Sequence, residues 1–146
     1  MREDAEISTT IANLRTLISE ASAYYVAHGT FGSSADGPRW NEVTNVPLNG
    51  NTTRVVAATD STDPTAHLQA GGQNCIGVRL VNKNGATPAY IAFTRTSPGA
   101  NTVCGQVLAS QAVTDYIDSA IGEAPNRITN AIPVGSSRGI YRPAGE

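Results

Sequence analysis

The chain of 146 residues is 40% hydrophobic and 15% charged, with a formal net charge of −2 and a pI near 5.6. This length suits one domain with a modest core, and the weak negative charge gives no reason to expect nucleic-acid or anionic-membrane binding by the bulk surface. In soluble domains, about a quarter of the residues are typically charged. The lower fraction favours an exported, densely packed subunit over a cytosolic enzyme.

The first predicted element is a long amphipathic helix over residues 1–28. Proline is absent from the first 37 residues, and Gly29 stands where a helix C-terminal cap belongs. Apolar side chains recur every three or four residues, which is the period of one helix face. The face that we expect to pack on the core comprises Ile7, Ile11, Leu14, Ile18, Ala21 and Tyr25.

The same helix carries charged side chains that fall outside this apolar face. Solvation of an outer face alone explains them, but surface ion pairs can also fix the register between neighbouring molecules while contributing little free energy. The candidate subunit contacts are therefore Arg2, Glu3, Asp4, Glu6, Arg15 and Glu20.

A connecting segment is expected over 29–51, because small, polar and proline residues cluster at 32–38. Trp40 is the only tryptophan, and packing over the helix is favoured over ligand stacking because Trp offers much apolar area in a chain with few aromatic residues. The expected core contacts of this segment are Val43, Val46 and Leu48.

A small antiparallel sheet is predicted next, beginning with a short β-branched strand at 52–58. Two further strands, at 75–81 and 89–95, flank residues 82–88, whose Asn-Gly pair and proline are typical of a hairpin connection. These two strands are therefore expected to pair with each other.

The two cysteines, Cys75 and Cys104, are the whole thiol inventory, and neither belongs to a C-x-x-C motif that would indicate zinc or redox chemistry. An even count in a chain of exported character favours one disulfide. It would close a loop of about 30 residues and stabilise the fold by roughly 3–4 kcal/mol. Two buried free thiols are the alternative, since spacing alone does not prove a bridge.

A second helix is expected over 106–121, with Gly122 as its stop, and residues 140–141 form a candidate edge strand in a loop-rich periphery. The predicted fold is α+β, with a long N-terminal helix packed against a small antiparallel sheet. One domain, 1–146, holds the sheet, the second helix and the C-terminal loops in its part 52–146.

No catalytic or metal-binding motif stands out. His28 and His67 lack a nearby histidine, cysteine or carboxylate at ligand spacing, so a surface or capping role is favoured. Asp60 and Asp63 share a loop but lack the further ligands of a calcium site, so a turn is favoured there. We expect no catalytic residue, no metal and no cofactor, and the protein is predicted not to be an enzyme.

The end of the first helix shows a pattern that goes beyond amphipathicity. Residues 13–21 (NLRTLISEA), followed by Tyr24-Tyr25 and by 28–31 (HGTF), combine an apolar helix face, aromatic residues, a polar step, a glycine and a further aromatic. This pattern resembles the end of the long N-terminal helix in type IV pilins and type II secretion pseudopilins. The resemblance covers roughly the first quarter of the chain; the family usually continues with proline, where this chain has Gly32.

The resemblance implies a pilin-like fold and a structural subunit of a bacterial type IV pilus that acts by polymerisation in adhesion, twitching motility or DNA uptake. Its implied partners are identical or related pilin subunits in a helical filament and an inner-membrane assembly machinery, with no specific nucleic acid. It further implies methylation and a full-length form anchored in the inner membrane before assembly. The implied localisation is the bacterial cell surface, in an extracellular pilus, after passage through the inner membrane and periplasm.

No stretch approaches the eighteen or so consecutive apolar residues of a membrane-spanning helix. In the family, a hydrophobic half-helix anchors the subunit, so we expect such a segment upstream of Arg2 in a longer natural coding sequence. A type II secretion pseudopilin is the alternative within the same fold. A free-standing extracellular binding module is the alternative outside it, and would carry a shallow site lined by Trp40 or Tyr141.

Overall fold

The computed structural model of the chain describes residues 2–58, 61–122, 127–134 and 141–142. These residues form an α+β arrangement with an N-terminal helix and an antiparallel sheet, as the sequence predicts. The elements in chain order are α1 (Arg2–His28), α2 (Trp40–Val43), β1 (Ala66–Ala70), β2 (Gln73–Val81), β3 (Tyr90–Arg95), α3 (Val103–Ala109), α4 (Gln111–Ile117), β4 (Ala120–Ile121), β5 (Ile128–Thr129), β6 (Ala131–Pro133) and β7 (Tyr141–Arg142).

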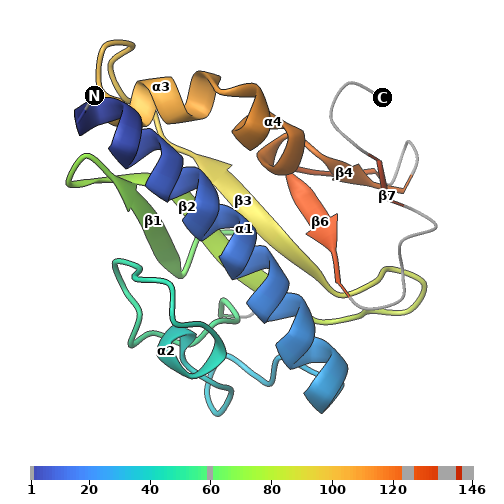
Figure 1. Ribbon diagram of the computed structural model, residues 1–146. Helices are drawn as coiled ribbons and strands as arrows, with labels where there is room; N and C mark the ends of the chain where they lie inside the picture. The colour runs from blue at the N-terminus through green and yellow to red at the C-terminus, as the bar shows by residue number, and fades with distance from the viewer. Residues whose placement is uncertain (1, 59–60, 123–126, 135–140, 143–146) are drawn as a thin grey trace.

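The main sheet has the strand order β1-β2-β3-β6, and all neighbouring strands are antiparallel. Helix α1 crosses one face of this sheet diagonally, and α3 and α4 lie along its upper side in Figure 1. A second, smaller sheet has the order β5-β4-β7. The main core therefore lies between α1 and the four-stranded sheet.

The hairpin predicted between residues 75 and 95 is confirmed. Strands β2 and β3 pair antiparallel, with Val78 opposite Phe93, and both side chains are buried. The connection between the two strands contains a tight turn, in which Asn84 and Thr87 exchange two backbone hydrogen bonds of 3.0 Å. Gly85 occupies the turn position with a φ of +61°, which glycine adopts without steric cost.

Helix α1 packs on the sheet through a face that is rotated from the predicted one. Its buried positions are Thr10, Leu14, Leu17 and Ala21. Of the predicted face, Leu14 and Ala21 are buried, and Ile7, Ile11, Ile18 and Tyr25 are half-buried but pack against the same core. Thr10 can lie at the contact because its hydroxyl donates to the Glu6 carbonyl at 2.9 Å, which satisfies its polar group.

Two other predicted elements are wrong. Residues 52–58 form no strand and only isolated bridges, of Arg54 with Arg39 and of Val56 with Leu80. The helix expected over 106–121 is split into α3 and α4 and ends at Ile117, after which β4 pairs with β5 and β7. Short apolar runs suit a buried strand as well as a helix.

The connecting segment contributes to the core as predicted. Trp40 is fully buried, and its Nε1 donates to Thr65 Oγ1 at 2.8 Å. Val43, Val46 and Leu48 are buried as well. Of the candidate edge strand at 140–141, Tyr141 belongs to β7 at the edge of the small sheet, while Ile140 lies outside the described residues. None of the described helices combines the length and apolar character needed to cross a membrane.

Candidate functional site

Between positions 5 and 27, where the structure describes the side chains, the exposed surface of α1 is nearly uncharged. Arg15 is the one charged residue among those exposed between positions 5 and 27. Surface helices of soluble proteins normally present charged and polar side chains on this side, so the composition suits close packing against another surface better than solvation. The exposed residues are Ala5, Ser8, Thr9, Ala12, Arg15, Thr16, Ser19, Ala23, Val26 and Ala27.

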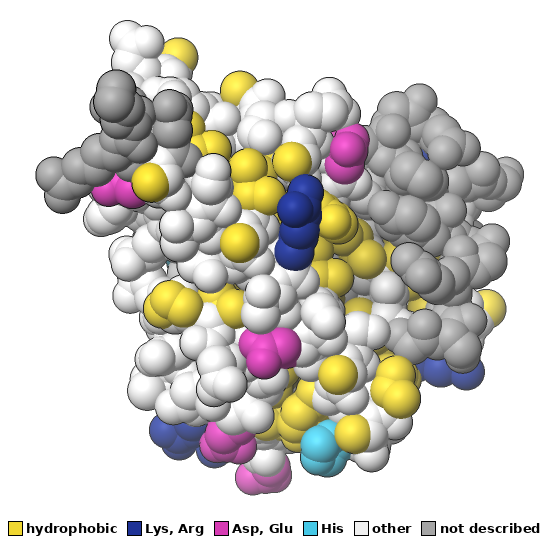
Figure 2. Space-filling view, in the orientation of Figure 1, with side chains coloured by type: hydrophobic (Ala, Val, Ile, Leu, Met, Phe, Trp, Pro, Cys, Tyr) yellow, Lys and Arg dark blue, Asp and Glu magenta, His cyan; other side chains and the backbone are white. Residues whose placement is uncertain are grey.

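An open groove of about 580 Å³ lies where the C-terminal half of α1 meets β6. Val26, at its α1 side, is 70% exposed, which is unusual for a large apolar residue. In Figure 2, white side chains predominate along the diagonal that α1 takes across this face, and hydrophobic side chains gather beside it, with dark blue and magenta side chains among them. The groove lining is Ile18, Ser19, Ser22, Ala23, Val26, Ala27, Ile132 and Pro133, none of which is charged.

The predicted subunit contacts divide into three groups. Arg2, Glu3 and Asp4 belong to the first turn of α1, and their side chains lie outside the described part of the chain. Glu6 is half-buried, and Arg15 is exposed on the outer face of α1. These positions leave the predicted contact role of the five residues open to a direct test.

Glu20 has a role within the chain that the sequence did not indicate. Its Oε1 accepts hydrogen bonds from the Thr44 hydroxyl at 2.5 Å and from the Asn45 backbone N–H at 3.2 Å. Charge-assisted bonds of this kind are among the stronger ones in proteins. Glu20 therefore fastens α1 to the segment that follows α2.

The predicted disulfide between Cys75 and Cys104 is present, with the two Cα atoms 5.5 Å apart. Both cysteines are fully buried. The bridge joins β2 near its start to the first turn of α3, which packs beside α1. It therefore ties the helical layer to the sheet and is not accessible for chemistry at the surface.

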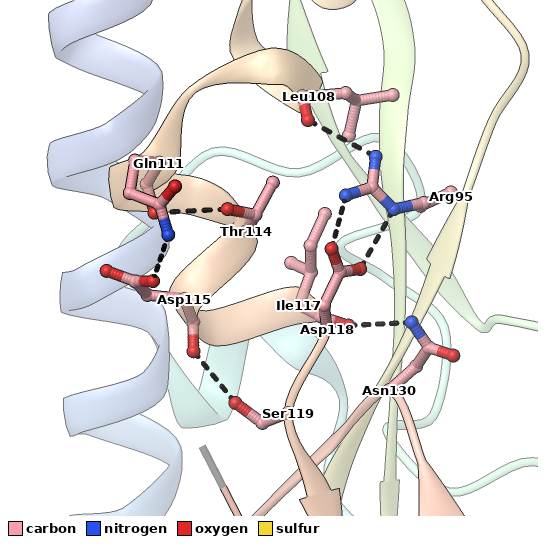
Figure 3. A network of polar contacts seen from close by, with 9 residues as sticks. All are labelled: Arg95, Leu108, Gln111, Thr114, Asp115, Ile117, Asp118, Ser119 and Asn130. Carbon is pink, nitrogen blue, oxygen red and sulfur yellow. Dashed lines mark hydrogen bonds and ion pairs between the residues drawn. The ribbon is translucent and has the colours of Figure 1, made fainter. Parts of the chain in front are cut away.

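A polar network joins β3 to the ends of α3 and α4 (Figure 3). Arg95 makes two hydrogen bonds with Asp118, Nε to Oδ1 at 3.0 Å and Nη2 to Oδ2 at 2.8 Å. Its Nη1 donates to the Leu108 carbonyl at 3.2 Å, and Asn130 Nδ2 donates to the Ile117 carbonyl at 2.7 Å. Arg95 and Asn130 thus supply hydrogen-bond donors to carbonyl groups at the ends of α3 and α4, where such groups have no partner within the helix. This accounts for the network as a structural one.

The aromatic residues of the pilin-like pattern pack together at the end of α1. Tyr24 stacks on His28 with ring centroids 3.9 Å apart, and the Tyr25 ring lies 5.0 Å from Phe31. His28 Nδ1 lies 2.9 Å from the Tyr24 carbonyl, one turn earlier. The structure thus places His28 at the helix end, as predicted.

The described part of the chain contains no group of three or more side chains that could hold a metal ion. The Asp63 backbone N–H donates to Ser61 Oγ at 3.2 Å, which is a local turn contact; Asp60 lies outside the described residues. Burial of Trp40 removes it from the shallow aromatic site that a binding module would need.

No protein-family model matches the chain, and no curated protein or solved structure is significantly similar to it. The candidate site is therefore inferred from the sequence and structure of this chain alone. Its main features are the outer face of α1 between positions 5 and 27, where Arg15 is the one exposed charge, and the groove beside β6.

Proposed function

We propose that this protein is a structural subunit of a bacterial filament of the type IV pilin class and that it acts by polymerisation. The observation that carries the proposal is the outer face of α1, where Arg15 is the one charge among the exposed residues from 5 to 27. A helix that remains in water gains from charged side chains on its outer face. Small side chains instead let a neighbouring backbone approach closely.

The layout of the chain supports the same proposal. The 27-residue helix α1 lies against one face of a four-stranded antiparallel sheet, an arrangement that the resemblance at 13–31 implies for a pilin-like subunit. The disulfide and the Glu20 contacts fasten this helix layer to the rest of the molecule. A rigidly held helix presents its outer face in a fixed geometry, which repeated subunit contacts require.

The groove beside β6 supplies the apolar area for such a contact. Burying apolar surface contributes about 25 cal/mol per Å², and Ile18, Val26 and Ile132 offer such surface without a charged side chain to desolvate. The loop between β2 and β3 lies at the other end of the molecule from the N-terminus (Figure 1). In the proposed filament this loop faces solvent and carries surface contacts.

The proposal is tested on cells that make the natural protein. Material sheared from their surface is examined by electron microscopy, and its protein is digested with trypsin and searched for the peptide 40–54. A strain that lacks the gene, and the same strain with the gene restored, are the controls. Thin filaments that contain the chain, disappear with the gene and return with it are the expected result.

Other results would reject the pilus. Filaments that persist without the gene would show that another protein builds them. Loss of protein secretion in a strain without surface filaments would favour the secretion pseudopilin instead. A monomeric chain in the culture medium would favour the extracellular binding module.

A further inference from the structure

The chain contains two Asn-Gly dipeptides, Asn49-Gly50 and Asn84-Gly85, in different structural settings. Because glycine has no Cβ, its backbone nitrogen is the least hindered nucleophile that can attack the side-chain amide of a preceding asparagine. In an unfolded chain both dipeptides are therefore prone to the same spontaneous cyclisation. Folding decides which of them can reach the required geometry.

Asn84 lies in an exposed turn that is held only locally. Its two backbone hydrogen bonds go to Thr87, three residues further along the chain. Within the described residues no hydrogen bond holds its side-chain amide or the Gly85 N–H. The space around Gly85 is open, since no heavy atom lies within 4 Å of the position that a Cβ would take. Such a turn opens without disturbing the ladder between β2 and β3.

Asn49 is exposed as well, but it is fastened to the main sheet. Its Nδ2 donates to Asn74 Oδ1 at 2.9 Å, and its backbone exchanges two hydrogen bonds of 2.9 Å with His67 in β1. Gly50 packs against the chain at Thr65, whose carbonyl oxygen lies 3.2 Å from the position of a Gly50 Cβ. Rotating the Asn49 side chain toward Gly50 therefore requires long-range contacts to break.

The geometry points to Asn84 as a site of spontaneous deamidation and backbone isomerisation in the folded protein, with Asn49 protected. The deprotonated Gly85 nitrogen attacks Asn84 Cγ, so that a new C–N bond forms while the bond from Cγ to Nδ2 breaks and ammonia leaves. Water then adds to either carbonyl of the cyclic imide and opens it to aspartate or isoaspartate. The balance is one side-chain amide and one water converted into one carboxylate and one ammonium ion.

This modification changes the surface of the β2–β3 loop. It adds one negative charge to a chain whose formal net charge is −2, directly beside Lys83. Isoaspartate also lengthens the backbone at position 84 by one methylene, which disrupts the paired hydrogen bonds between Asn84 and Thr87. The inference does not depend on the filament function proposed above.

The test follows both sites in one sample. The purified protein is incubated folded in mildly alkaline buffer, and aliquots are digested briefly with trypsin. Tandem mass spectrometry then compares the peptide 84–95 with the peptide 40–54 and locates each converted residue. The same chain, reduced and kept in denaturant, provides the reference rate for each dipeptide without structure.

We expect both dipeptides to convert at comparable rates in the unfolded chain. In the folded protein, Asn84 is expected to convert faster than Asn49 by about tenfold or more, because Asn49 must first break hydrogen bonds that each contribute to stability. Equal conversion of the two residues in the folded protein, or protection of Asn84 to the level of Asn49, would overturn the inference.

Two variants test the protection of Asn49 and the conversion of Asn84 separately. Asn74→Ala removes the acceptor of the Asn49 amide, so it is expected to speed conversion at Asn49 and to leave Asn84 unchanged. Asn84→Gln is expected to abolish conversion in the peptide 84–95, because the longer side chain closes an unfavourable ring. Because the peptide 84–95 contains no other side-chain amide, conversion at an undiminished rate in that variant would refute the attack of the Gly85 nitrogen on Asn84 as its cause.

Discussion

The side chain of Asn82 holds the backbone of Phe31, whose N–H donates to Asn82 Oδ1 at 2.6 Å. The same side chain donates through Nδ2 to the Gly32 carbonyl at 2.7 Å and accepts from the Thr30 hydroxyl at 3.2 Å. Phe31 is fully buried. The residue that follows β2 thus fixes the point where the chain leaves α1 and turns back over the core.

Replacing Asn82 with alanine should weaken the fold at this point. Asn82→Ala leaves the Phe31 N–H and the Gly32 carbonyl without their partner, and we expect the free energy of unfolding to fall by about 1–3 kcal/mol. Denaturant unfolding followed by circular dichroism measures the change. Lys83→Ala, at the exposed neighbouring residue, is the matched control and should lie within about 0.5 kcal/mol of the parent chain. Equal values for both variants would contradict a stabilising role for Asn82.

Loss of the disulfide should cost more. The bridge closes a loop across a sequence separation of 29 residues, so the double variant Cys75→Ala/Cys104→Ala is expected to lower the free energy of unfolding by roughly 3–4 kcal/mol in the chain-entropy model. Unfolding of the oxidised and the reduced parent chain provides the comparison. An unchanged denaturation midpoint after confirmed reduction would show that the bridge contributes nothing to stability.

The parts of the fold that follow strong local patterns were predictable. The β2–β3 hairpin combines β-branched strands with an Asn-Gly turn, and both features act locally. The sequence AHLQA of β1 contains no β-branched residue, so its strand conformation comes from pairing with β2 instead of from propensity. Conversely, residues 52–58 have a high β-strand propensity, but the structure pairs them with other segments only through isolated bridges.

The residues of the candidate site were also only partly predictable from local sequence patterns. Periodicity identified α1 and its apolar character, but Leu17 and Ile18 both continue apolar rows, and the sequence does not say which row meets the sheet. The structure buries Leu17 and leaves Ile18 half-exposed in the groove beside β6. The partners of Glu20 and Arg95 lie 24 and 23 residues away in sequence. Contacts at such separation leave no local pattern in the chain.

The ion pair between Arg95 and Asp118 should contribute little on its own. The two side chains are 36% and 39% exposed, so a double-mutant cycle of Arg95→Gln and Asp118→Asn is expected to give a coupling of about 1 kcal/mol or less that decreases with added salt. Asp115→Asn is the control, because Asp115 accepts from Gln111 and not from Arg95. Coupling of Arg95 to Asp115 as strong as to Asp118 would contradict the geometry in Figure 3.

Trp40 should report on the core instead of on a ligand site. Its side chain is fully buried with Nε1 bonded to Thr65, so the native protein is expected to emit at short wavelength and to resist quenching by acrylamide. The denatured chain supplies the exposed reference for the same residue. Native quenching close to that of the denatured chain would place Trp40 at the surface and restore it as a candidate for ligand stacking.

A charge placed on the outer face of α1 should block assembly without unfolding the subunit. Ala23 is exposed and lines the groove beside β6. Ala23→Glu therefore meets no steric obstacle within the chain, and it changes helix propensity by less than about 1 kcal/mol. If the groove is buried between subunits, the variant must bury an unpaired carboxylate, which is strongly unfavourable. We expect its unfolding midpoint to stay close to that of the parent chain, while the amount of chain in sheared filaments falls sharply.

The matched control introduces the same substitution at a position that faces solvent in the proposed filament. Ala86→Glu adds an identical charge at an exposed alanine of the β2–β3 loop, which the proposal leaves facing solvent. Both variants are introduced into the gene in the source cells, and filament content is measured by mass spectrometry of the sheared fraction. Normal filaments with Ala23→Glu would refute the role of the groove, because a carboxylate in its lining cannot be accommodated in a dry contact without a partner. Loss of filaments with Ala86→Glu alone would instead place the subunit contact at the loop.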